Sequence, residues 1–185
     1  RSLSRERCEG GSRRGSEGGV SAIARVRAAL TTFPRAADWL RLTFELVWLA
    51  PILAALGWAG GLVNPQPLDL ASFLRFAAVA LFVPALAEEA IFRGTLLPTP
   101  NSHPSLFRCA LAIAAFVAWH PLQVLWFGEA WGAVVLNPWF LAAVVALGVA
   151  TTRLYLATSS LWPPIVLHWL VVVAWKALGG ASPWT

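Results

Sequence analysis

The sequence predicts an all-α membrane protein, a multi-pass transmembrane helical bundle with about five spans. Hydrophobic residues make up 58% of the 185-residue chain and charged residues only 12%, roughly half the charged fraction of an ordinary soluble domain. The apolar residues gather in long stretches, each near the ~20 residues that a helix needs to cross a bilayer. The chain also contains 11 Trp residues, a residue type that is typical of membrane–water interfaces.

The predicted segments follow from where these stretches begin and end. A polar residue beside a proline marks a helix start, because proline fits the first helical turn and the polar side chain caps it. Asn137-Pro138 is one such pair. The Trp-rich residues 123–136 are predicted to form an interfacial or re-entrant piece. In chain order, the predicted spans are residues 38–58, 69–97, 104–122, 138–157 and 163–178.

The N-terminal part of the chain has a different composition. Residues 1–35 are rich in Arg, Ser, Gly and Glu, and they are predicted to form a disordered basic extension before a transmembrane domain over residues 36–180. The net charge is +5, and most of the positive excess precedes Leu46. Because these charges flank apolar segments, they indicate a multi-pass integral membrane protein with a cytoplasmic N-terminus. We expect the lipid bilayer as a partner and no nucleic acid.

Ionisable residues inside the predicted spans need an explanation, since each costs roughly 2.5–3.5 kcal/mol to insert. Glu89 and Arg93 are four residues apart, so they stack on one helix face and can pair. Glu88 is rotated from Glu89 by about 100° and lacks that partner, which makes it a candidate general base. Pro84, one turn earlier, is expected to bend the helix. The alternative is that Glu88, Glu89 and Arg93 form a cluster of polar contacts between helices with a purely structural role.

Two histidines lie in the later spans. Phe116 precedes His120 by one turn and can pack against its imidazole, and His168 lies on the second turn of the last span. Either His alone is equally well explained as a hydrogen bond between helices. Together with Glu88, they suit peptide hydrolysis. Glu88 would take a proton from water with the help of His120, and His168, if it donates, would stabilise the oxyanion.

The same residue types also allow a metal site. Glu88, His120 and His168 could together hold zinc. The chain has no HExxH motif, so we favour a site without metal and without any other cofactor. The acids gather in one cluster instead of lining a span, which ranks a proton or ion pathway last.

Three motifs, taken in order, resemble those of the CPBP family of intramembrane proteases, also called type 2 CAAX prenyl proteases or the Abi family: Glu88-Glu89-x-x-x-Arg93, Phe116-x-x-x-His120 and His168. The resemblance implies a glutamate-dependent endopeptidase in a bacterial-type plasma membrane, acting on a peptide or protein substrate in the membrane. In that pattern Glu88 activates water, Glu89 pairs with Arg93, and the two His residues complete the site. Prenylated C-terminal motifs are one substrate class of the family.

One position departs from this pattern. The third motif of the family usually carries Asn or Asp four residues after its His, where this chain has Val172. Valine cannot donate a hydrogen bond, and the loss of an oxyanion donor lowers a rate by ~10²–10³-fold. The alternative interpretation is therefore a catalytically impaired scaffold or immunity protein on the same fold.

The predicted spans place the candidate site residues at different depths in the membrane. His120 lies at the far end of its span, on the order of 20 Å from the turn near Asn101, whereas Glu88 lies closer to that turn. A shared site therefore requires that the third span starts later than residue 104 or tilts strongly. We expect Glu88, His120 and His168 to converge in one cavity.

Overall fold

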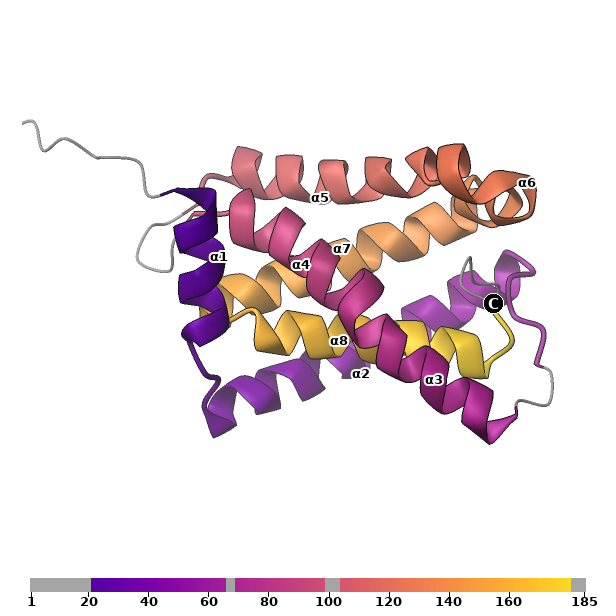
Figure 1. The fold of residues 1–185 in the computed structure, drawn as a ribbon, viewed down its shortest axis with the longest axis horizontal. Coiled ribbons are helices and arrows are strands. Elements are labelled where there is room, and N and C mark those ends of the chain that lie inside the picture. The colour runs from indigo at the N-terminus through magenta and orange to yellow at the C-terminus, as the bar shows by residue number, and fades with distance from the viewer. Residues whose placement is uncertain (1–20, 66–68, 99–103, 181–185) are drawn as a thin grey trace, which may run out of the picture.

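The computed structural model describes residues 21–65, 69–98 and 104–180. Within these ranges the chain is helical and has no strand, which confirms the predicted all-α bundle (Figure 1). The η segments are wide π-helical turns. In chain order, the elements are α1 (Ala22–Thr31), α2 (Ala36–Ala59), α3 (Leu70–Ala80), η1 (Leu81–Leu86), α4 (Ala87–Glu89), η2 (Ala90–Thr95), α5 (Leu106–Leu122), α6 (Val124–Val135), α7 (Pro138–Thr158) and α8 (Trp162–Ala177).

All five predicted spans are helical, but they differ in length. Among the described residues, three helices are long and apolar enough to cross a membrane: Ala36–Ala59, Leu70–Thr95 and Pro138–Thr158. The second of these combines α3, η1, α4 and η2 into one passage of 26 residues. Helices α5 and α6 meet the same criterion only as a pair, which is bent by 93°. Helix α8 is apolar but has only 16 residues.

Polar caps set the helix starts close to the predicted positions. The Asn137 side chain accepts a hydrogen bond from the Trp139 amide at 2.9 Å, and Asp69 accepts one from the Ser72 amide at 2.8 Å. Ser105 caps α5, which begins two residues after the predicted start at residue 104. Each cap satisfies an amide that has no partner inside its helix.

The predicted disordered extension over residues 1–35 is wrong for its last part, because residues 22–31 form α1. Ser21 caps this helix, and Ala29 is buried in its face toward the bundle. The Leu161 amide donates to the Ala29 carbonyl at 3.1 Å, and the Trp162 indole donates to the Leu30 carbonyl at 2.9 Å. These tertiary contacts hold α1 across one end of the bundle (Figure 1). Residues 1–20 lie outside the described residues.

Gly94 of η2 is the point of closest approach to α1. A Cβ atom at this position would lie 2.8 Å from Val26 Cγ2, and a contact this short forces the two elements apart. We expect Gly94→Ala to destabilise the protein by about 1–3 kcal/mol and to speed hydrogen exchange of the α1 amides. Gly132→Ala is the matched control, since its Cβ would meet neighbours at 3.4 Å. Equal exchange in the two variants would show that α1 does not depend on this contact.

The passage Leu70–Thr95 is broken just before the acidic pair. Val83 has φ −135° and ψ 112°, which are not helical values. The next residue is Pro84, and a proline pushes the residue before it away from the helical region. The expected bend at Pro84 is therefore present. The wide turns η1 and η2 enclose α4, a kind of irregularity that is frequent at functional sites.

A second irregularity follows α5. The Trp-rich stretch predicted as interfacial or re-entrant is α6, which turns 93° away from α5 at Gln123. Gly128 inside it has φ 77°, a conformation that glycine adopts without steric cost. Leu125 and Trp126 remain largely exposed. Helix α5 therefore ends at a sharp corner of the chain, formed by the 93° bend between α5 and α6.

Helix α7 packs against α2, α5 and α8 and so lies inside the bundle. Leu49, Phe116 and Leu167 are fully buried in the core that these helices share. On the outward side of α2, Leu40 and Val47 stay exposed, which suits a surface that faces lipid tails as apolar as leucine itself.

Candidate active site

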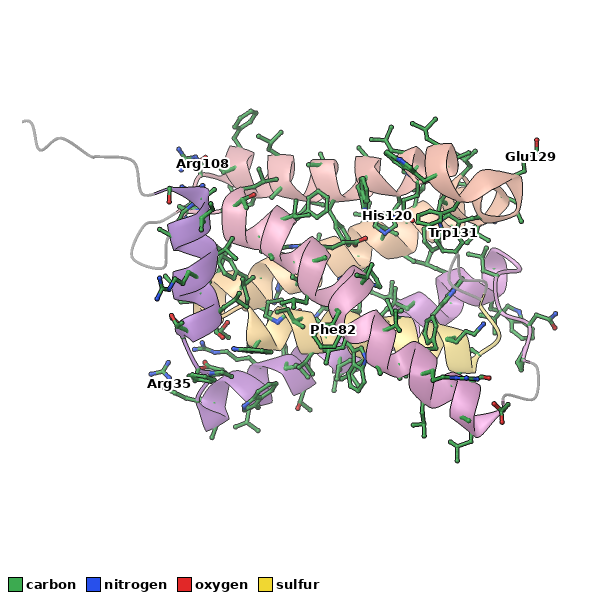
Figure 2. The ribbon with its side chains drawn as sticks, in the orientation of Figure 1. Arg35, Phe82, Arg108, His120, Glu129 and Trp131 are labelled. Carbon is green, nitrogen blue, oxygen red and sulfur yellow. The ribbon has the colours of Figure 1, made fainter. Side chains whose placement is uncertain are left out.

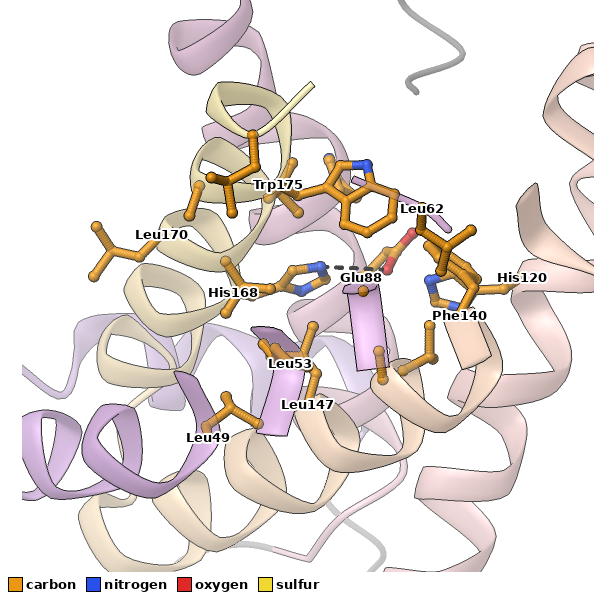
Figure 3. A pocket seen from close by; sticks show the side chains of 18 of the residues that line it. Leu49, Leu53, Leu62, Glu88, His120, Phe140, Leu147, His168, Leu170 and Trp175 are labelled. Carbon is orange, nitrogen blue, oxygen red and sulfur yellow. Dashed lines mark ion pairs between the residues drawn. The ribbon is translucent and has the colours of Figure 1, made fainter. Parts of the chain in front are cut away.

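Five buried ionisable side chains surround one region of the bundle. They come from α4 (Glu88, Glu89), η2 (Arg93), the last turn of α5 (His120) and α8 (His168), and none is more than 8% exposed. Glu88, His120 and His168 line a single cavity of about 820 Å³. Figure 3 shows Glu88 between the two imidazoles. The expected convergence of these three residues is therefore present.

Glu89 and Arg93 form a fully buried ion pair. Arg93 Nη1 lies 3.1 Å from Glu89 Oε1, and both side chains are 0% exposed. Arg93 also donates to the Gly148 carbonyl at 3.2 Å, and its guanidinium lies 4.3 Å from the centre of the Phe116 ring. These contacts compensate a buried charge that would otherwise be costly.

Glu89 also fixes the orientation of His168. The same oxygen, Oε1, lies 2.9 Å from His168 Nδ1. A carboxylate only accepts, so Nδ1 carries the hydrogen of this contact. The other ring nitrogen, Nε2, then points toward Glu88 and lies 3.9 Å from its Oε2 (dashed line in Figure 3).

Glu88 is held differently from Glu89. Its Oε1 accepts a hydrogen bond from the Trp119 indole at 2.9 Å. Its Oε2 is buried and has no hydrogen-bond partner among the described residues. The 3.9 Å between Oε2 and His168 Nε2 allows one water molecule to bridge them at about 2.8 Å from each, once a shift of the surrounding side chains uncovers Oε2. One carboxylate oxygen is thus anchored, and the other is unpartnered among the described residues.

His120 is oriented by its own helix. Its Nδ1 lies 2.9 Å from the Phe116 carbonyl, which only accepts, so Nδ1 carries the hydrogen and the neutral ring keeps a lone pair on Nε2. The Phe116 ring packs edge to face against His120 at 5.0 Å and against His168 at 5.8 Å. Phe116 therefore makes the contact expected of it and separates the two imidazoles.

The arrangement of α5 and the Leu70–Thr95 passage explains how His120 and Glu88 meet despite their different predicted depths in the membrane. Helix α5 starts at Leu106, only slightly later than predicted, and the passage Leu70–Thr95 runs at an angle to it and approaches it at the η2 end (Figure 1). The Trp119 side chain bridges the remaining gap to Glu88. His120 and Glu88 therefore reach the same cavity although their distances from the turn differ along the chain.

Three contributors to the site were missed by sequence reasoning. Trp119 holds Glu88, Gln123 lines the cavity, and the Gly148 carbonyl accepts from Arg93. A buried indole N–H needs a partner, and a lone amide inside an apolar segment calls for an explanation, so the first two had a signal. The role of the Gly148 carbonyl has no signal in the sequence, because every residue has a backbone carbonyl.

Zinc is the alternative that the sequence left open for these residues. Among the described residues, no three His, Cys, Asp or Glu side chains are placed to hold a metal ion together. In the set Glu88, His120 and His168, the Nδ1 atoms of both rings are engaged by other groups, so Nε2 of each ring is the nitrogen that a metal would bind. The reaction proposed below uses no metal, and the chelation experiment tests that choice.

Comparison with known proteins finds one family whose sequence pattern matches this chain. Residues 70–174, more than half of the chain, match the protein-family model described as Type II CAAX prenyl endopeptidase Rce1-like. The matched part runs from α3 to near the end of α8, so it includes all five buried ionisable residues. Neither a curated protein nor a solved structure matches the chain.

Proposed function

The chain belongs to the type II CAAX prenyl endopeptidase family, a family of membrane proteases, and we propose that it is itself a glutamate-dependent intramembrane endopeptidase. One observation carries the proposal. Glu88 is a buried carboxylate with one oxygen anchored by Trp119 and the other unpartnered among the described residues, 3.9 Å from His168 Nε2. A base needs this arrangement if it is to hold and deprotonate a water molecule.

The proposed reaction is a direct attack by water on a peptide bond. Glu88 Oε2 takes one proton of the water, while the lone pair of His168 Nε2 accepts a hydrogen bond from the other. The water oxygen bonds to the scissile carbonyl carbon, whose oxygen becomes the oxyanion. Protonated Glu88 then gives its proton to the leaving amine as the C–N bond breaks. His120, with its free Nε2, assists the base from the opposite wall of the cavity.

Glu89 and Arg93 have a positioning role in this proposal. Glu89 holds His168 through Nδ1, and Arg93 neutralises Glu89 so that both charges can stay buried. Without this pair, the His168 ring has no fixed tautomer or direction. The two neighbouring glutamates therefore serve separate purposes, one chemical and one architectural.

The proposed substrate is a peptide or protein that reaches the site from the membrane. The cavity wall is mostly aliphatic and aromatic, so it suits an apolar segment or a lipid-modified chain end. Figure 2 shows Arg35 and Arg108 at the end of the bundle where α1 lies, and Glu129 at the opposite end. We place the α1 end in the cytoplasm, since positive charge favours that side.

A second candidate function has one observation in its favour. Val172 lines the cavity with an apolar side chain, where the family pattern has a hydrogen-bonding one. A catalytically impaired membrane scaffold or immunity protein on this fold would keep the buried ion pair and have no turnover.

The deciding experiment is a cleavage assay with the purified protein in vesicles. Prenylated and unprenylated peptides that end in a CAAX motif are incubated with it, and the products are identified by mass spectrometry. We expect hydrolysis at one peptide bond of the prenylated peptide. Absence of any product from either peptide, with the protein shown to be folded, would favour the scaffold.

We expect cleavage to be insensitive to metal chelation. Because Glu88 itself activates the water in the proposed reaction, 1,10-phenanthroline and EDTA should leave kcat within about twofold of the untreated value. The check is a rate measurement before and after chelation, with a zinc protease treated in parallel as a positive control. Loss of activity that added zinc restores would overturn the metal-free mechanism.

A further inference from the structure

Peptide hydrolysis needs a hydrogen-bond donor for the oxyanion, and few donors in the cavity are free. The Trp119 indole is committed to Glu88, and the Trp131 indole is committed to Gln123. Each His uses its Nδ1 hydrogen for another contact, and Trp175 has contacts of its own. The polar side chains that line the cavity are those of Glu88, Trp119, His120, Gln123, Trp131, His168 and Trp175.

Gln123 is the exception. It is 7% exposed, and its Oε1 accepts the Trp131 indole N–H at 2.8 Å. An indole N–H can only donate, so the amide atom that faces Trp131 must be the oxygen. The amide nitrogen is therefore turned away from Trp131, and it makes no hydrogen bond to the described residues. This nitrogen is not among the buried side-chain atoms that lack a partner, so it keeps an accessible surface and a ligand in the cavity that Gln123 lines can supply its acceptor.

We propose that the Gln123 side-chain amide is the oxyanion donor of this protease, a role that rests on the proposed function. Gln123 follows His120 by three residues, so the two lie on the same face of the helix end. The backbone N–H of Gln123 donates to the His120 carbonyl at 3.1 Å, so the two residues belong to the same helical turn. In the tetrahedral intermediate, Nε2 donates to the oxygen that was the scissile carbonyl oxygen.

This assignment also accounts for Val172. Val172 on α8 and Gln123 at the end of α5 line the same cavity. A donor on α5 leaves position 172 free to be apolar. The Trp131 indole is then a positioning residue, because it selects which end of the amide faces the substrate.

The test compares variants of the full-length protein in vesicles, with the prenylated CAAX peptide as substrate. Gln123→Met keeps the size of the side chain and removes the donor. We expect kcat to fall by about 10²–10³-fold with KM nearly unchanged, because the lost contact forms only in the transition state. Adding Val172→Asn to Gln123→Met should restore at least about tenfold, which a purely structural role for Gln123 does not predict.

Two further variants keep the test decisive. Gln123→Glu retains an acceptor for Trp131 and should lose kcat as Gln123→Met does, even if the Met variant folds poorly. Trp131→Phe frees the amide to rotate and should lower kcat by a smaller factor. Wild-type kcat in both Gln123 variants, together with inactivity of Glu88→Gln, would overturn this inference and leave the proposed function standing. Wild-type activity in Glu88→Gln would instead overturn the proposed function.

Discussion

Replacing Glu88 with glutamine is expected to lower kcat by about 10²–10⁴-fold, the usual contribution of a general base. Glutamine has the same shape and can still accept the Trp119 indole hydrogen bond, so the cavity should keep its form. It cannot take a proton from water. Initial rates of peptide cleavage, measured in vesicles with equal amounts of folded protein, provide the check.

Glu45→Gln is the matched control for this variant. Glu45 is also a buried glutamate, 6% exposed, but it binds Trp48 at 2.6 Å and Arg153 at 3.1 Å outside the cavity. We expect this change to leave kcat within about twofold of wild type. If Glu45→Gln and Glu88→Gln lowered kcat equally, the effect would be one of charge or stability, and Glu88 would lose its assigned role.

Replacing Arg93 with methionine is expected to cost about 3–5 kcal/mol of folding stability, since it leaves the Glu89 charge buried without its partner. The guanidinium is 0% exposed and contacts Glu89, the Gly148 carbonyl and the Phe116 ring. Methionine fills part of the space but supplies no donor. Unfolding in mixed detergent micelles, followed by circular dichroism, measures the loss.

Two controls locate the origin of that loss. Arg153→Met breaks a pair whose arginine is 58% exposed and whose buried glutamate, Glu45, keeps the Trp48 indole hydrogen bond, so we expect a smaller loss than in Arg93→Met. Adding Glu89→Gln to Arg93→Met removes the unpaired charge and should recover part of the stability while leaving His168 poorly oriented. An equal loss in Arg93→Met and Arg153→Met would contradict the idea that burial makes the first pair decisive.

Much of the fold was predictable because membrane spans are constrained by few rules. Length and apolarity define the segments, and caps such as Asn137 and Asp69 fix where helices begin. Helix α1 escaped prediction because its order comes from tertiary contacts. Small residues such as Ala29 fit against the bundle, and the carbonyls of α1 receive hydrogen bonds from residues more than a hundred positions away.

The candidate site was predictable only where its geometry is local. The spacing of Glu89 and Arg93 is one helical turn, and so is that of Phe116 and His120, so these pairs could be read along the chain. The roles of Trp119 and Gln123 depend on a helix from elsewhere in the chain and on the corner after α5. Periodicity along the sequence does not predict contacts of this kind between residues of different helices.

The bend after α5 ties the site to the surrounding lipid. The α5–α6 passage reaches membrane length only as a bent pair, and a bilayer of different thickness acts on such a passage by tilting or bending it. Trp119, His120 and Gln123 share the last turn before the bend, so a change in its angle moves all three as one body relative to Glu88 and His168. We therefore expect the spacing between the proposed base, imidazole and amide to change with the thickness of the membrane.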